Sequence, residues 1–80
     1  MSTVDELATD VAGAVGAVIA RQVDADTAFA DLHMDSLDYA EINVSLSEAY
    51  AVRLPEGAVR EAGCVRELVR MIRAQVEARA

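Results

Sequence analysis

The 80-residue chain lacks the residue types that mark several large classes of protein. Its one cysteine cannot form an internal disulfide, so the chain does not need an oxidising compartment. It contains no lysine, and its seven arginines face fourteen acidic residues, which gives a formal net charge of −7. A protein with so little positive charge is not expected to neutralise the phosphates of a nucleic acid or to bind an anionic membrane.

Long apolar segments are also missing, because no run reaches the roughly 18 residues that a membrane-spanning helix needs. Residues 1–6 (MSTVDE) do not form a signal peptide. We therefore expect a soluble, cytoplasmic protein that folds as one small domain over residues 1–80. A domain of this size has little room for a deep, enclosed active site.

The acidic residues gather in the middle of the chain. Residues 24–56 contain eight acids and one base, Arg53, so this segment alone has a net charge of −7. The remaining residues are neutral, with six acids and six arginines. A concentrated negative field favours the approach of basic partners, although simple solubility is the alternative explanation.

Apolar residues recur at helical spacing in three long segments, and no segment has the alternation of a strand. The first helix is expected from a cap at Ser2 or Thr3 to about residue 20 or 21, and the second begins at Ser36. After the break at Pro55, a short helix over residues 56–62 should end at Gly63, and a last helix of about 15 residues follows. The predicted fold class is all-α, with three long helices, one short helix and a long loop.

The loop between the first two helices, residues 22–35, loses helical periodicity but keeps two apolar residues, Phe29 and Leu32. We expect their side chains to anchor the loop on the core. Structured loops of more than about 12 residues are uncommon in compact domains and are often functional.

The second helix has two apolar faces with different surroundings. We expect the core-facing side to consist of Ile42, Leu46, Ala49 and Tyr50. The other face is apolar in its middle and acidic at its edges, which suits docking by a partner protein. Its residues are Leu37, Ala40, Val44, Asp38, Glu41 and Glu48.

Ser36 stands at the start of this helix, directly behind the long loop. Serine is a preferred N-cap, and Asp38 in the first turn suits the positive end of the helix dipole. A phosphate ester on the exposed hydroxyl would face backbone N–H groups at the same end. By itself, however, this spacing is more typical of an ordinary N-cap serine.

With Asp35-Ser36-Leu37 as its attachment motif, the sequence resembles the acyl carrier protein family. The resemblance covers nearly the whole chain and includes Phe29, Leu32, Asp38, Glu41, Leu46, Glu48, Tyr50, Leu54-Pro55 and Val65-Arg66-Glu67-Leu68. It implies a four-helix bundle in which Ser36 holds 4′-phosphopantetheine, with Asp35 and Leu37 at the attachment site. The thiol of that arm would hold an acyl group as a thioester, so the protein would be a carrier and not an enzyme.

The resemblance also implies a succession of partner enzymes. These are a phosphopantetheinyl transferase that adds the arm from coenzyme A, an acyltransferase or ligase that loads it, and a ketosynthase or other thioester-processing enzyme. The recognition helix for them would use Asp38, Ala40, Glu41, Val44 and Glu48. We expect a monomer without a metal site, because the single histidine, His33, has neither a nucleophile nor a second metal ligand near it in sequence.

Two departures from the family pattern are interpreted as structural. Many carriers have glycine at the position of His33, and some backbone strain follows if this residue takes a positive φ. The alternative is that His33 titrates beside the prosthetic group. Cys64 replaces the serine or threonine that often caps the last helix, which costs a little stability.

Tyr39 and Asn43 are a further departure. They lie one turn apart beside the core face, where fatty-acid carriers sequester an aliphatic chain, and an amide facing that space needs a hydrogen-bond partner. Two interpretations stay open. Either the carrier handles a short, polar or aromatic acyl unit that these residues contact, or the two side chains point to solvent or satisfy each other.

These departures, the absence of lysine and the abundance of Ala, Val and Arg favour a free-standing carrier of a polyketide or other secondary-metabolite pathway, such as antibiotic biosynthesis, over fatty-acid biosynthesis. An aminoacyl or peptidyl carrier of a non-ribosomal peptide pathway is the runner-up, although its motif more often has a Gly-Gly pair. An acidic helical adaptor without a prosthetic group is the alternative from a different class.

Self-repulsion among the acids of residues 24–56 should destabilise the fold at low ionic strength, because folding brings unscreened like charges together. Added NaCl or Mg²⁺ at neutral pH is therefore expected to raise the melting temperature, measured by circular dichroism. A melting temperature that stays flat or falls across the salt titration would contradict this explanation.

Overall fold

The computed structural model describes residues 3–79, and their side chains from residue 6 onward. The elements in this range are α1 (Thr3–Ile19), the 3₁₀ turn η1 (Phe29–Leu32), α2 (Ser36–Tyr50), α3 (Ala58–Ala62) and α4 (Val65–Arg79). The predicted class of three long helices, one short helix and a long loop is confirmed for these residues. The cap expected at Ser2 or Thr3 depends on side chains outside the described set.

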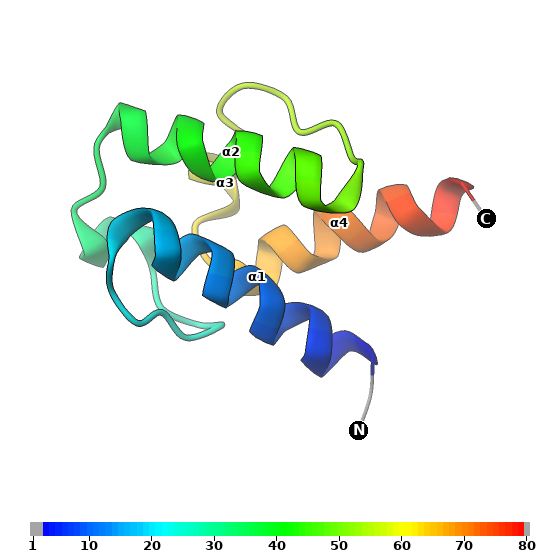
Figure 1. Ribbon diagram of the computed structural model, residues 1–80, viewed down its shortest axis with the longest axis horizontal. Helices are drawn as coiled ribbons and strands as arrows, with labels where there is room; N and C mark the ends of the chain where they lie inside the picture. The colour runs from blue at the N-terminus through cyan, green and yellow to red at the C-terminus, as the bar shows by residue number, and fades with distance from the viewer. Residues whose placement is uncertain (1–2, 80) are drawn as a thin grey trace.

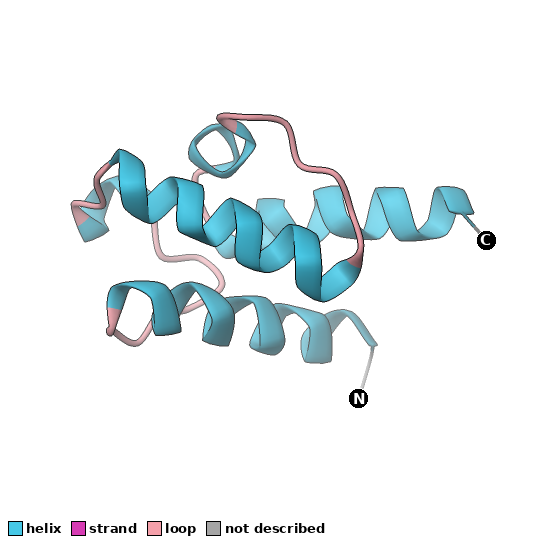
Figure 2. Cartoon of the chain, turned by 45° about the horizontal axis from the view of Figure 1, so that its top comes forward, coloured by secondary structure: helices cyan, strands magenta, loops and turns pink. Residues whose placement is uncertain are grey.

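The three long helices form a bundle that α3 closes at one side. Figure 1 shows α1 running in the opposite direction to α2, whereas α4 points the same way as α2. α1 packs against both α2 and α4, and α3 packs against α2 and α4. Figure 2 shows α3 end-on where the long helices lie lengthwise, so the short helix crosses their direction beside the first half of α2.

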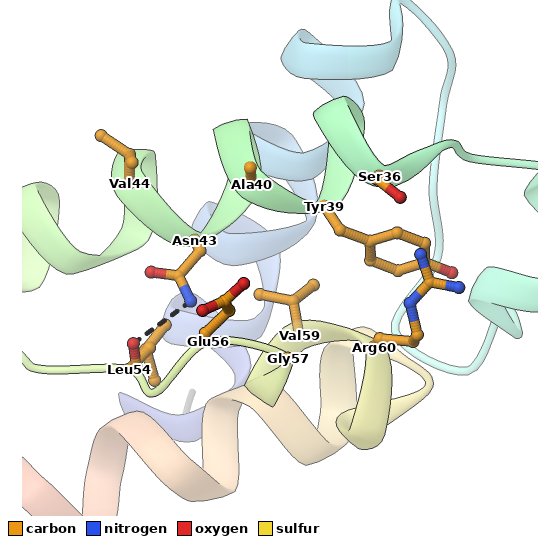
Figure 3. A pocket seen from close by; sticks show the side chains of 10 residues that line it. All are labelled: Ser36, Tyr39, Ala40, Asn43, Val44, Leu54, Glu56, Gly57, Val59 and Arg60. Carbon is orange, nitrogen blue, oxygen red and sulfur yellow. Dashed lines mark hydrogen bonds between the residues drawn. The ribbon is translucent and has the colours of Figure 1, made fainter.

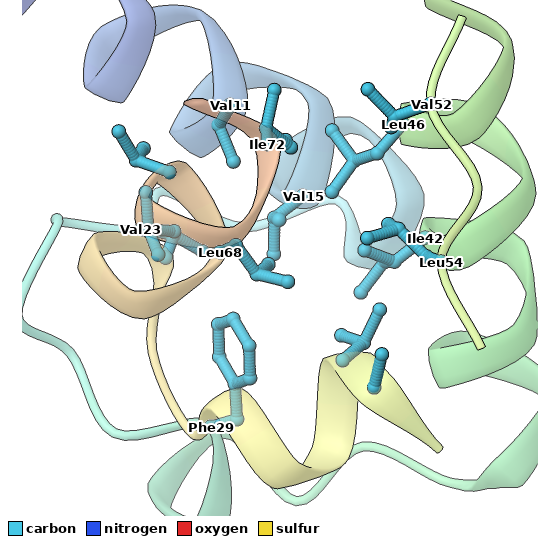
Figure 4. Close-up of a cluster of buried hydrophobic side chains, with 14 of the residues drawn as sticks. Val11, Val15, Val23, Phe29, Ile42, Leu46, Val52, Leu54, Leu68 and Ile72 are labelled. Carbon is cyan, nitrogen blue, oxygen red and sulfur yellow. The ribbon is translucent and has the colours of Figure 1, made fainter. Parts of the chain in front are cut away.

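The core is a single apolar cluster to which every helix contributes (Figure 4). The apolar spacing of three and four residues lets each long helix bury one face. The largest fully buried side chains are Val11, Val15, Phe29, Ile42, Leu46, Val59, Val65, Leu68 and Ile72. Ala49, expected in this core, is exposed, because the last turn of α2 instead presents Tyr50 towards Leu7 of α1 and Ile72 of α4.

Two helix boundaries differ slightly from expectation. α1 ends at Ile19 because Ala20 takes a left-handed φ of 57°, after which the Arg21 N–H donates to the Gly16 carbonyl at 3.1 Å. A Cβ atom on Gly16 would lie 2.5 Å from the Arg21 carbonyl oxygen, so this turn requires glycine. α3 starts at Ala58 and not at residue 56, since a turn closes from the Ala58 N–H to the Pro55 carbonyl at 3.0 Å.

The long loop is anchored on the core by Phe29 and Leu32, as predicted, since both side chains are buried. Its backbone is also bonded to the junction between α3 and α4. The Phe29 N–H donates to the Gly63 carbonyl at 2.8 Å, and the Arg66 N–H donates to the Ala25 carbonyl at 3.0 Å. The loop therefore has a defined position ahead of α2.

One ion pair reinforces this junction. The Arg66 guanidinium donates to both carboxylate oxygens of Asp26, at 2.6 and 2.9 Å. Hydrogen bonding to Arg66 holds the pKa of Asp26 below its usual value. Both side chains are exposed, so solvent screens the pair and its contribution to stability is small.

The segment that follows α2 is held by side chains of α4. Gln75 donates to the Arg53 carbonyl at 2.6 Å and accepts from the Arg53 N–H at 2.9 Å. The Arg79 guanidinium donates to the carbonyls of Ala51 and Tyr50, at 2.8 and 3.3 Å. The two Arg79 bonds satisfy carbonyl groups at the end of α2 that have no partner within the helix.

Replacing Phe29 by alanine should unfold most of the protein. Truncating a buried phenylalanine costs about 3–5 kcal/mol, which is comparable to the net stability of about 3–5 kcal/mol expected for a domain of this size. Circular dichroism of Phe29→Ala is expected to show a large loss of helix. Leu37→Ala is the matched control, because Leu37 is 65% exposed, and it should melt like the wild type. Similar melting of the two variants would mean that Phe29 is not the anchor.

Candidate functional site

Ser36 is the first residue of α2, and its side chain is exposed. The N-cap is the preceding residue, Asp35, so the expectation that Ser36 caps the helix was wrong. The Asp35 carboxylate accepts from the Asp38 N–H at 2.9 Å, while the Asp38 carboxylate accepts from the Asp35 N–H at 3.2 Å. This reciprocal capping box uses both acids and leaves the Ser36 hydroxyl without a hydrogen-bond partner among the described residues.

His33 lies in the turn that leads into this site. It takes the left-handed conformation, with φ 54° and ψ 42°, and ends η1. The position where many carriers have glycine thus does require a positive φ, and histidine tolerates that region better than a β-branched residue would. The side chain is exposed. This turn redirects the chain from the anchored loop into α2.

The outer face of α2 has the predicted combination of apolar and acidic residues. Leu37 and Val44 are large apolar side chains that are 65% and 55% exposed. Ala40, Glu41 and Glu48 are exposed on the same helix. Asp38 is half-buried, because its carboxylate takes part in the cap.

A groove of about 520 Å³ runs between α2 and α3 and begins at Ser36 (Figure 3). The residues that line it are Ser36, Tyr39, Ala40, Asn43, Val44, Leu54, Glu56, Gly57, Val59 and Arg60. The apolar walls of the groove include Ala40, Val44, Leu54 and Val59, and in Figure 3 the side chains of Asn43 and Glu56 lie between Val44 and Val59, whereas Arg60 lies at the Ser36 end. A larger hollow of about 680 Å³ lies between α1 and α4, and Ser36 does not line it.

Asn43 makes hydrogen bonds to the protein through both ends of its side-chain amide. Its side-chain NH₂ donates to the carbonyls of Leu54 and Pro55, at 3.2 and 3.1 Å, and its amide oxygen accepts from the Ser47 hydroxyl at 3.2 Å. The suggestion that Asn43 and Tyr39 satisfy each other was therefore wrong. Asn43 thereby joins α2 to the segment that forms the other wall of the groove, with both acceptors of its NH₂ group supplied by the backbone. Figure 3 shows the bond to the Leu54 carbonyl.

Tyr39 packs against residues from two other segments. Its half-buried ring meets the ring of Phe29 edge-on, with 6.4 Å between the centroids and 66° between the planes. The Tyr39 ring also contacts Arg60, whose guanidinium carbon lies 4.3 Å from the ring centroid, within the range of a cation–π interaction. Sequence analysis missed Arg60. The feature of the sequence that could have identified Arg60 is its positive charge on the short helix, directly after the acidic segment of residues 24–56.

The residues at the start of α2 fit a phosphate ester on Ser36. The hydroxyl is exposed and unbonded, and the N–H groups of the first helical turn that the cap does not use have no partner within the helix. The residues do not suggest a metal centre, since no group of three or more His, Cys, Asp or Glu among those described could hold an ion. In the same part of the chain, no helix is long and apolar enough to cross a membrane.

The family comparison agrees with this geometry. The family model of the phosphopantetheine attachment site matches residues 3–72. The chain belongs to this family. No curated protein and no solved structure matched in the other two comparisons. The expected resemblance to acyl carrier proteins is thereby confirmed for most of the chain.

Membership explains the organisation of the site. Domains of this family hold 4′-phosphopantetheine covalently on a serine and act as carriers that interact with enzymes such as transferases and synthases. A carrier needs an accessible serine and a surface that partners can reach, more than an enclosed cavity. The exposed start of α2 and its outer face have these properties.

The capping box leads to a prediction about the free energy of unfolding. Asp35→Ala should destabilise the unmodified carrier by about 1 kcal/mol, since the cap to the Asp38 N–H is lost. Ser36→Ala should change the free energy of unfolding by less than about 0.5 kcal/mol, because its hydroxyl bonds to nothing in the described structure. Urea denaturation measures both, and the opposite ranking would mean that Ser36 is the cap.

Proposed function

We propose that Ser36 is the attachment serine and that the carrier shuttles acyl intermediates, held as thioesters, between biosynthetic enzymes. The observation that favours Ser36 is its exposed, unbonded hydroxyl at the start of α2. The other serines in the described part of the chain, Ser45 and Ser47, are half-buried within α2, and Ser47 donates to Asn43. When attached, the arm supplies the thiol that holds the acyl group.

The chain's own residues prepare this attachment. Asp35 and Asp38 hold the first turn of α2 in place through the capping box, so the serine is presented at a rigid helix end. Leu37, the next residue, projects into solvent and supplies an apolar contact for an enzyme that approaches Ser36. Within this proposal the protein is not itself an enzyme, and the arm, not a protein side chain, holds the reacting group.

The outer face of α2 is the proposed docking surface for partner enzymes. It combines the exposed apolar side chains of Leu37, Ala40 and Val44 with the acids Glu41 and Glu48. A phosphopantetheinyl transferase, a loading acyltransferase or ligase, and a ketosynthase or similar enzyme would each approach with a basic surface. Screened charges give fast association without slow release, as a carrier that visits several enzymes in turn requires.

The proposed pathway is polyketide or other secondary-metabolite assembly, and the groove beside Ser36 supports this choice. A groove suited only to a fatty chain would be apolar throughout, whereas this one has Glu56 and Arg60 among its lining residues. A short acyl unit with polar groups suits such a lining better. We further propose that the carrier works as a monomer in the cytoplasm.

The attachment is tested by incubating the protein with coenzyme A and a promiscuous phosphopantetheinyl transferase, followed by intact mass spectrometry. The wild type should gain the mass of one arm and Ser36→Ala should gain none. Ser45→Ala is the matched control, a serine of the same helix, and it should be modified like the wild type. A wild type that gains no mass would favour the adaptor without a prosthetic group.

A further inference from the structure

Arg60 has a different setting from the three arginines of α4 that form ion pairs. Arg66, Arg70 and Arg73 of α4 each have a carboxylate within 4.0 Å, on Asp26, Glu67 and Glu77 respectively. Among the described residues, the Arg60 guanidinium has no carboxylate partner, although it lies next to the most acidic part of the chain. Its one assigned contact is the face of the Tyr39 ring, at 4.3 Å.

No hydrogen bond or ion pair among the described residues uses the donors of this guanidinium. A guanidinium has five N–H donors and no acceptor, and the contact with Tyr39 is with an aromatic ring and not with an oxygen acceptor. Tyr39 is in turn held by its edge-on contact with the buried ring of Phe29. The donors are therefore presented at the groove from a supported position, and Figure 3 draws them at the end of the groove where Ser36 lies.

The other residues that line the groove limit which chemical groups of a ligand can bind there. Ala40, Val44, Leu54 and Val59 provide apolar walls that suit carbon chains. Asn43 has no amide hydrogen to offer, because the carbonyls of Leu54 and Pro55 take both. Glu56 is an acceptor with a negative charge and would repel an oxygen anion. Apart from Ser36 itself, the side-chain donors left in this lining are the Tyr39 hydroxyl and the Arg60 guanidinium, and of these two Arg60 has the positive charge and the larger number of N–H groups to offer an oxygen atom of a ligand.

We infer that Arg60 is a specificity residue that favours acyl groups bearing a further carbonyl or carboxylate oxygen over hydrocarbon acyl groups of the same length. The inference rests on the proposed attachment at Ser36, which brings the cargo to the groove. A hydrocarbon chain in this groove would cover the guanidinium edge without satisfying its donors, whereas a ketone or carboxylate oxygen accepts from them. Tyr39 acts as a positioning residue for Arg60.

The test uses carriers loaded in one step, by transferring the whole acylated arm from butyryl-, acetoacetyl- or malonyl-coenzyme A with a promiscuous transferase. Butyryl and acetoacetyl have the same four-carbon chain and differ by one ketone oxygen, while malonyl adds a carboxylate. Intact mass verifies each loading before measurement. Two readouts follow: the NMR resonance of the Arg60 side-chain Nε–H group, and the melting temperature.

Acetoacetyl and malonyl are expected to shift the Arg60 Nε–H resonance relative to the carrier with the arm alone, and butyryl is not. The acetoacetyl form should melt about 4–8 °C above the butyryl form, as one additional hydrogen bond of about 1 kcal/mol predicts for a domain of this size. If malonyl and acetoacetyl both shift the Arg60 resonance, Arg60 recognises a carbonyl or carboxylate oxygen. If only malonyl shifts it, Arg60 recognises the carboxylate.

Arg60→Gln should remove the difference in melting temperature between the acetoacetyl and butyryl forms. Arg53→Gln is the matched control, since it removes the same charge from an exposed arginine that does not line the groove, and it should keep the difference. The readout is the difference in melting temperature between two loaded forms of the same variant. A loss of stability caused by the substitution itself lowers both melting temperatures and does not change this difference. The resonance shift in the wild type does not depend on any variant folding.

Three results would overturn the inference while leaving the carrier function intact. The first is a loaded wild type whose Arg60 resonance is the same with every cargo. The second is a resonance that shifts when the arm alone is attached and does not change further with cargo, which would assign Arg60 to the phosphate of the arm. The third is an acetoacetyl-to-butyryl difference that persists in Arg60→Gln. Failure of the arm to attach at all would instead contradict the proposed function.

Discussion

The burial of Phe29 is the constraint on which the arrangement of the site depends. Its ring is 1% exposed and lies in the core between the helices, while its backbone N–H bonds to the carbonyl of Gly63 at the junction of α3 and α4. Tyr39 of α2 packs edge-on against the same ring, and Arg60 of α3 stacks on Tyr39. One loop residue thereby sets the positions of the start of α2, the short helix and the groove between them.

The acidic segment has opposite effects on stability and on recognition. Glu41 and Glu48 remain exposed beside the apolar side chains of α2, where repulsion between like charges raises the free energy of the folded chain and where, in the proposed function, the same charges attract basic partner surfaces. Other acids of the segment are used structurally. Asp35 and Asp38 form the capping box, and Asp26 is paired with Arg66. Part of the charge of −7 therefore serves local structure, and the exposed remainder is available for the proposed recognition of partner enzymes.

The parts of the fold that depend on local pattern could be predicted from the sequence. The helical spacing of apolar residues identified the long helices, Gly63 ended the short helix, and Phe29 and Leu32 anchored the loop. Predictions failed where two neighbouring groups compete for one role. Asp35 and Ser36 are both good caps, and the carboxylate of Asp35 took the bond because Asp38 could return it. Ala49 and Tyr50 compete for the last inward position of α2, and the larger side chain occupies it.

The sequence by itself determined the class of fold, the acidic face of α2 and the presence of the Asp35-Ser36-Leu37 motif, because each depends on spacing along one segment. Only the tertiary structure decided which side chains meet across segments. It directed the amide of Asn43 to the carbonyls of Leu54 and Pro55, eleven and twelve residues away, and it brought Arg60 onto Tyr39. Such contacts follow from how α3 crosses α2, and that crossing is set by the packing of the whole core and not by any single stretch of sequence.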